Sequence, residues 1–145
     1  MTTWILVANQ SVAKIFERSS KNGVPELIEE FQHPAGRLHE GDLVTDKGAA
    51  VFQSAGSGQQ RSTGTEVEAT EHQAQIFAGE LAEQLRRARV DDRYRALALI
   101  CAPAFLGHLR EALDDATAKL VTAEVDKNIS EQPTGELPAT LQNLL

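Results

Sequence analysis

The sequence predicts an α/β domain built on a mixed sheet of about five strands. Residues 4–8 and 96–102 form apolar runs without a polar interruption, which is typical of strands buried on both faces of a sheet. Pro103 follows the second run directly, and apolar residues then return at helical spacing. A buried strand that leads straight into an amphipathic helix is half of a β-α-β unit, so we expect a layered domain with the strand at 96–102 near its centre.

The remaining elements follow in order along the chain. Alternating patterns predict strands at 12–17 and 26–31, which form an antiparallel meander with residues 4–8. A long loop at 33–69 precedes the first helix. A last strand is expected at 120–125, with Val121, Ala123 and Val125 toward the core, and a short terminal helix runs through Leu144. The order is β-β-β-loop-α-β-α-β-α, in one domain spanning 1–145 with helices on the faces of the sheet.

The first helix is predicted to begin at Thr70. Thr70 and Gln73 have the spacing of a capping box, in which each side chain satisfies a free backbone N–H of the first turn. An apolar stripe then continues for several turns, and Glu83 and Arg87 are placed to pair on the solvent side. This pattern predicts a helix that packs on the sheet along one face.

Composition limits the classes of protein to consider. The chain has 145 residues, of which 41% are hydrophobic, as in an ordinary globular domain. Its single cysteine, Cys101, lies in a buried run, which excludes a disulfide scaffold and favours a reducing compartment. We find no signal-peptide pattern and no run of transmembrane length, so we expect a cytoplasmic protein without membrane insertion. The net charge of −7 argues against binding DNA or RNA with the whole surface.

The segment at 33–69 is either a working loop or a flexible one. It holds six of the ten glycines and many Ser, Thr and Gln residues. His39, Asp42 and Asp46 are metal-ligand residue types, but they form no tight ligand motif, so we predict no metal site. Asp42, Asp46 and Lys47 are retained as candidate binding residues of this loop.

Arginines gather at the end of the first helix and just after it: Arg86, Arg87, Arg89, Arg93 and Arg95. With Lys14 and Arg18 they could form a patch that faces phosphate groups of an RNA. Arginines at the end of a helix also complement its dipole, and this structural interpretation is the more general one. His72 and His108 are interpreted as ordinary polar residues of helix surfaces.

Four segments together are similar to the bacterial host attachment protein family. They are WILVANQSVAKIFE at 4–17, LVTDKG at 43–48, FAGELA at 77–82 and APAFLGHLREAL at 102–113. The family is named for a protein required for attachment to host cells, and it resembles the middle domain of archaeal and eukaryotic peptide-chain release factors and of Pelota. The fold that this resemblance implies agrees with the order of elements above. The family name records a phenotype and no reaction.

The resemblance to release factors implies a candidate catalytic tip. Release factors of that type carry Gly-Gly-Gln on the loop before the long helix, where the Gln helps water to reach the peptidyl-tRNA ester. Here the corresponding residues are GSGQQR at 56–61, so Gly58 and Gln59 are candidates, and Ser57 replaces the first glycine. Glycines allow close approach of a backbone to a substrate, and a neighbouring Gln can orient water. Asn9 stands where such sequences often have Asp, which leaves no carboxylate at that position.

Two hypotheses of function result. The favoured one is a non-catalytic interaction protein with a release-factor-middle-domain-like fold, required directly or indirectly for attachment, whose 33–69 loop presents a surface to a protein partner. The alternative is a ribosome-associated peptidyl-tRNA hydrolase or ribosome-rescue factor that uses Gly58 and Gln59. Neither needs a cofactor. A second copy could pair with the strand at 26–31, although its glutamates oppose this pairing.

Overall fold

The computed structural model describes residues 1–20, 22–35 and 55–145, and for 55–67 it describes the course of the backbone alone. The strands are β1 (Thr3–Ala8), β2 (Val12–Arg18), β3 (Glu26–Gln32), β4 (Ala96–Cys101) and β5 (Val121–Val125). The helices are α2 (Ala55–Val90), α3 (Pro103–Ala112), α4 (Asp115–Ala118) and α5 (Leu137–Leu144). The α/β class predicted from the sequence is therefore confirmed.

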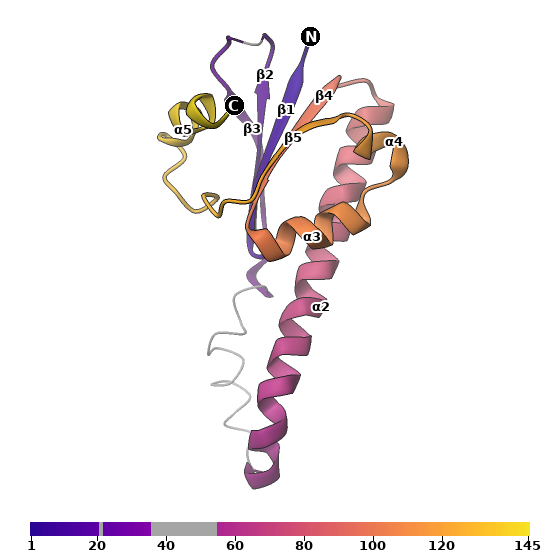
Figure 1. Cartoon of the computed structure of the whole chain (residues 1–145), viewed down its shortest axis with the longest axis vertical. Helices are drawn as coiled ribbons and strands as arrows, with labels where there is room; N and C mark the ends of the chain where they lie inside the picture. Colours follow the sequence, from indigo (N-terminus) through magenta and orange to yellow (C-terminus); the bar gives the residue numbers. More distant parts are fainter. Residues whose placement is uncertain (21, 36–54) are drawn as a thin grey trace.

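The five strands form one mixed sheet in the order β3-β2-β1-β4-β5. β1 to β3 are an antiparallel meander, whereas β4 pairs with β1, and β5 with β4, in parallel. β1 is the central strand, and Ile5 through Ala8 have no exposed surface. Continuous apolar runs suit β1 and β4 because helices cover both faces of the sheet, as Figure 1 shows.

One face of the sheet packs against α2 and α3 (Figure 1). The buried positions of α2 recur at helical spacing from Ala74 to Ala88, and Phe105, Leu106 and Leu109 of α3 complete this core. The other face is covered by α5, where Leu137 and Leu141 pack on Ile5, Val7, Phe16, Ala98 and Ile100. The sheet therefore separates two hydrophobic cores, with the larger one on the α2 face.

The long helix begins earlier than predicted. α2 starts at Ala55 and runs for 36 residues, about 54 Å at 1.5 Å per residue. The predicted loop at 33–69 is therefore wrong over its second part, and Thr70 lies inside the helix instead of capping it. Helix extension from a packed segment is favourable even through residues of low propensity, because only nucleation is costly. Figure 1 shows the first half of α2 projecting beyond the sheet.

The last strand also differs from the prediction in one respect. Val121 packs with the core on the α2 face, whereas Ala123 and Val125 pack on the α5 face. The pairing of β4 with β5 shifts between Leu97 and Ala98, which places an extra residue in β5. Such a shift reverses the faces of all later side chains, so simple alternation fails.

Cys101 is buried and free, as predicted, and burial raises the pKa of its thiol to about 12. Within the described part of the chain, no helix is both long enough and apolar enough to cross a membrane.

Candidate functional site: a groove between β3 and the end of α2

A groove of about 220 Å³ lies on the α2 face of the sheet, between the edge strand β3 and the last turns of α2. The sheet contributes an apolar floor, and the end of α2 and the turn after it contribute a polar wall. The lining residues are Trp4, Ile15, Ile28, Glu29, Phe31, Gln84, Arg87, Ala88, Asp91 and Arg93. Five of the ten lining residues are apolar, and the other five are polar or charged.

The groove exists because β3 is only partly covered. On this face Ile28 and Phe31 are half-buried, whereas their neighbours on β1 and β2, Trp4 and Ile15, are buried. The register of β2 with β3 shifts between Ile15 and Phe16, and this shift brings Ile28 to the α2 face together with Glu29. α2 lies over the centre of the sheet, so the edge beside it remains open to the groove.

Trp4, the only tryptophan, is held from three sides. Its ring stacks on Tyr94 with the centroids 5.0 Å apart, and the Arg93 guanidinium carbon lies 5.0 Å from its centroid on a cation–π contact. Its indole Nε1 donates a hydrogen bond of 3.0 Å to Glu17 Oε2. This wall of the groove is therefore preorganised.

The turn that places Arg93 is a Schellman motif at the end of α2. The amide of Arg93 donates to Ala88 O, and that of Asp92 donates to Arg89 O. Asp92 has φ of 59°, the left-handed conformation that this cap requires. The backbone then returns over the sheet, with Arg93 and Tyr94 directed at Trp4.

Three carboxylates lie on the α2 face of β2 and β3, and one of them, Glu29, lines the groove. Glu17 and Glu26 are directly opposite on β2 and β3, and Glu29 is opposite Ile15, so all three carboxylates are on the α2 face. Like charges opposite each other destabilise a sheet by a few tenths of a kcal/mol or more. Within the described part of the chain, Glu26, Glu29 and Asp91 have no ion-pair partner.

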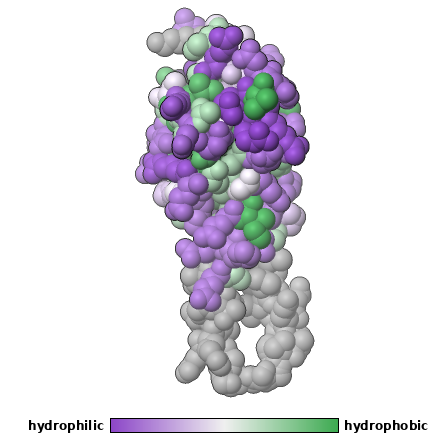
Figure 2. Space-filling view, turned by 90° about the vertical axis from the view of Figure 1, so that its right-hand side faces the viewer, coloured by the Kyte–Doolittle hydropathy of each residue, from purple (hydrophilic) through white to green (hydrophobic). Residues whose placement is uncertain are grey.

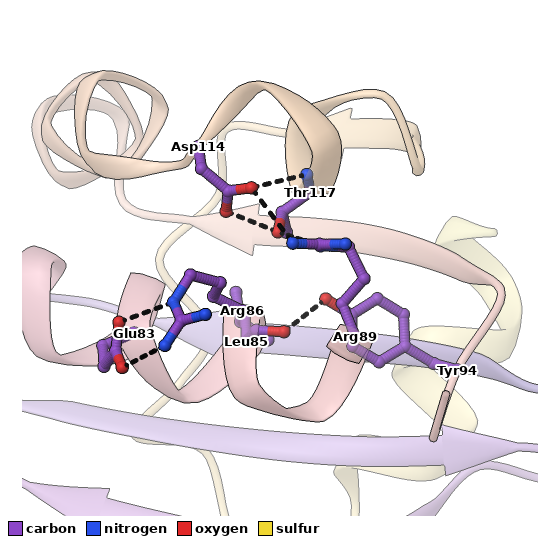
Figure 3. Close-up of polar contacts among 7 residues, drawn as sticks. All are labelled: Glu83, Leu85, Arg86, Arg89, Tyr94, Asp114 and Thr117. Atoms are coloured by element: carbon purple, nitrogen blue, oxygen red, sulfur yellow. Dashed lines mark hydrogen bonds and ion pairs between the residues drawn. The ribbon is translucent and has the colours of Figure 1, made fainter. Parts of the chain in front are cut away.

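The predicted arginine patch is divided among separate contacts. Arg86 and Arg87 both donate to Glu83, at 2.8 Å and 3.0 Å, and these hydrogen bonds lower the Glu83 pKa to about 2. Arg89 is directed away from them, toward α4, as Figure 3 shows. Only Arg87 and Arg93 of the candidate arginines line the groove. Arg86 and Arg87 therefore share one carboxylate, whereas Arg89 and Arg93 have other partners, and a role of these arginines in binding stays a prediction.

Arg89 belongs to a network that fixes α4 to the end of α2 (Figure 3). Its Nε donates to Thr117 Oγ1 at 3.0 Å, and Thr117 Oγ1 donates to Asp114 Oδ1 at 2.6 Å. Asp114 also caps α4 by accepting from the Thr117 amide, and the hydrogen bonds from Thr117 lower the pKa of this carboxyl. Tyr94 donates its hydroxyl to Leu85 O at 2.7 Å, and burial raises its pKa to about 12.

Lys14 does not join the arginines, contrary to the prediction. It alternates with Ala13 and Ile15 along β2 and therefore faces α5, where its Nζ donates to Gln132 O at 3.2 Å. Arg18 shares that face by the same alternation. The whole thickness of the sheet separates these two cations from α2.

Asn9 forms a polar cluster at the carboxyl end of β1. Its Oδ1 accepts from the amides of Ser11 and Val12, both at 2.9 Å, which closes the turn between β1 and β2. Its Nδ2 donates to Asn128 Oδ1 and to Glu131 Oε2, at 3.2 Å and 2.8 Å. An aspartate at this position could accept the hydrogen bonds from the Ser11 and Val12 amides, but an ionised carboxylate could not donate to Asn128 and Glu131. The amide therefore ties the segment after β5 to the first turn, which is a structural role.

Several predicted site residues lie outside these contacts. Asp42, Asp46, Lys47 and His39 lie outside the described residues. Gly58 and Gln59 fall in the first turns of α2 and not in a loop. The Gln59 side chain lies outside the described part of the chain, so a hydrolytic role stays a prediction. His72 is exposed on α2 and His108 is half-buried on α3. The described ranges contain no group of three or more metal-ligating side chains.

Sequence reasoning missed the groove and one histidine beside it. Trp4 and the glutamates of β3 were assigned to strands, and nothing in their spacing places them opposite Arg93. His33, at the end of β3, stacks on Phe77 of α2 and is within hydrogen-bond distance of Gln73. In the sequence, the place of His33 just after a predicted strand was the one indication of this contact.

The comparisons with known proteins give the family. The family model described as "Protein required for attachment to host cells" matches residues 4–141. The chain belongs to this family. The matched range contains all of the groove residues and all five strands, apart from Thr3 at the start of β1. The host-attachment resemblance is thus confirmed, whereas likeness to a release-factor middle domain stays a prediction. No curated protein matches the chain.

The face of the molecule on the α2 side is mostly hydrophilic. Figure 2 shows the face on the α2 side, where hydrophilic residues predominate and hydrophobic residues form separate spots. That view contains no broad continuous apolar area among the described residues. Contact through this face would therefore depend on polar groups and on small apolar areas.

Proposed function

We propose that this member of the host-attachment family is a non-catalytic interaction protein that contributes to attachment by binding a protein partner in the groove between β3 and α2. The supporting observation is the set of contacts that fixes the side chain of Trp4. Tyr94, Arg93 and Glu17 hold this buried tryptophan in the wall of the groove, so the surface that Ile28 and Phe31 partly expose beside it is fixed before any partner binds. A preformed surface lowers the entropy cost of binding.

The other polar clusters support the same reading. Asn9 and Asp114 lie in networks whose members satisfy one another and hold segments of the fold together. The groove differs, because Glu29 and Asp91 line it without an ion-pair partner in the described chain. Charged groups that gain nothing within the fold are available to a partner.

The test is complementation of a deletion strain in an attachment assay. Glu29→Arg reverses a charge and places a long side chain in the groove, and because Glu29 is exposed the fold should be retained. We expect attachment to fall to the level of the deletion strain. The matched control is Glu111→Arg, on an exposed position of α3 outside the groove, which should restore attachment fully. Circular dichroism and urea unfolding confirm that both variants are folded. Full attachment by Glu29→Arg would contradict the proposal.

A further inference from the structure

We infer that an extended, basic segment of a partner protein pairs with the outer edge of β3, beside the groove, and directs Lys or Arg side chains on the α2 face toward Glu29 and Asp91. This inference rests on the proposed function and specifies the chemistry of the partner. It combines three observations: the backbone of β3, the unpaired carboxylates on its α2 face, and the composition of the whole strand.

The backbone of β3 is available for pairing on its outer side. The His33 amide donates to Ser11 O at 2.8 Å, so in this antiparallel ladder Phe31 and Glu29 also direct their backbone groups toward β2. Glu30 and Gln32 then direct theirs away from β2. β3 is an outermost strand of the sheet formed by the described residues. An added strand could hydrogen-bond there, which is a common mode of peptide recognition.

The charges on β3 favour a cationic segment. Glu26 and Glu29 are on the α2 face of β3 without an ion-pair partner in the described part of the chain, and the groove beside them is lined by Glu29 and Asp91 against Arg87 and Arg93. Arg87 shares Glu83 with Arg86, and Arg93 lies on the Trp4 ring. A strand added beside β3 places alternate side chains on the α2 face, directly next to Glu29. Lysine or arginine at those positions would neutralise charges that the fold leaves uncompensated.

The composition of β3 argues against a second copy as the occupant. The strand reads ELIEEFQ and carries three glutamates without a basic residue. Two copies pairing edge to edge would bring these carboxylates together, which is how natural edge strands avoid self-association. A basic strand from a different protein meets no such repulsion.

The probe is a short capped peptide of alternating lysine and valine, titrated against the full chain. Trp4 is the only tryptophan and lines the groove beside this edge, so a change in its fluorescence is the signal for binding. We expect a saturable change that weakens as salt rises, because partly exposed charges are screened. Hydrogen exchange should slow at the amides of Glu30 and Gln32. The first control peptide has glutamate in place of lysine and lacks the positive charges. The second has alternate backbone amides methylated and cannot form the strand hydrogen bonds. Neither control peptide should bind.

Variants locate the site. Glu29→Gln with Asp91→Asn should weaken peptide binding by about three- to tenfold, the range expected for two partly exposed ion pairs. Glu30→Gln is the matched control, because Glu30 is adjacent in β3 but faces the other side of the sheet. Absence of saturable binding, equal binding of the acidic or methylated peptide, or unchanged affinity in the double variant would each overturn the inference. Attachment separates the two proposals: if Glu29→Arg loses attachment but basic peptides do not bind, the interaction site stands and the basic segment does not.

Discussion

The imidazole of His33 lies flat on the ring of Phe77, with the centroids 4.9 Å apart and the planes 7° apart. Its Nε2 is 2.9 Å from Gln73 Oε1, and its Nδ1 is 4.0 Å from Glu80 Oε1. His33 is the residue directly after β3, and these contacts join it to three consecutive turns of α2. β3 and α2 border the groove on opposite sides, and the contacts of His33 hold the two elements together.

Removing this stack should loosen β3. We expect His33→Ala to lower the free energy of unfolding by about 1 to 2 kcal/mol, because it removes both an aromatic pair and a half-buried hydrogen bond. Urea unfolding measures the change. His72→Ala, at an exposed position of α2, is the control and should change stability by less than about 0.5 kcal/mol. Equal stability of the two variants would show that the stack does not hold the strand.

Tyr94 allows a direct test of the packing beneath Trp4. It is the only tyrosine, and burial raises its pKa from the ordinary 10.0 to about 12. A raised pKa means that the folded state favours the neutral phenol. Its contribution to stability is therefore complete below pH 10.0 and is lost as pH rises through about 12. Ultraviolet titration should show tyrosinate forming near the higher value in the native protein and near the lower one in urea; coincident curves would contradict the burial.

Glu83 should contribute to acid sensitivity. Hydrogen bonds from Arg86 and Arg87 lower its pKa from 4.5 to about 2. A lowered pKa means that the stabilisation is present above pH 4.5 and is lost as pH falls toward 2. Glu83→Gln should therefore flatten the dependence of unfolding on pH in this window, by a small amount because the group is exposed. Glu111→Gln, which removes a carboxylate from α3, should leave the slope as in the parent chain.

Leu99 tests the assignment of β4 as a buried strand. Leu99 has no exposed surface and lies in β4 between β1 and β5. Leu99→Asp would bury a carboxylate without a partner, so we expect the chain to be unfolded by circular dichroism at neutral pH. Leu99→Met keeps the volume and should cost less than about 1.5 kcal/mol. A folded Leu99→Asp protein would contradict the assignment of β4 as a buried strand.

Local pattern was sufficient for most of the fold. Residues 4–8 and 96–102 are apolar without interruption, and this requirement of a strand covered on both faces is visible in the chain itself. Pro103 at the start of α3 and the ion pair of Glu83 with Arg87 were likewise predictable, because both depend on neighbours within one helical turn. The start of α2 was not, because helix extension from the packed segment overrides the low propensity of residues 55–69.

The groove was decided by the tertiary structure alone. Trp4 and Arg93 belong to segments far apart in the chain, and they meet because β1 and β4 pair in parallel and a left-handed cap at Asp92 turns the chain back over the sheet. Lys14 and Arg87 were expected on one surface, yet the alternation of β2 places the sheet between them. Periodicity shows that a residue is buried or exposed along its own element. Which elements share a face depends on strand order, register shifts and helix caps, and these arise only when the elements pack together.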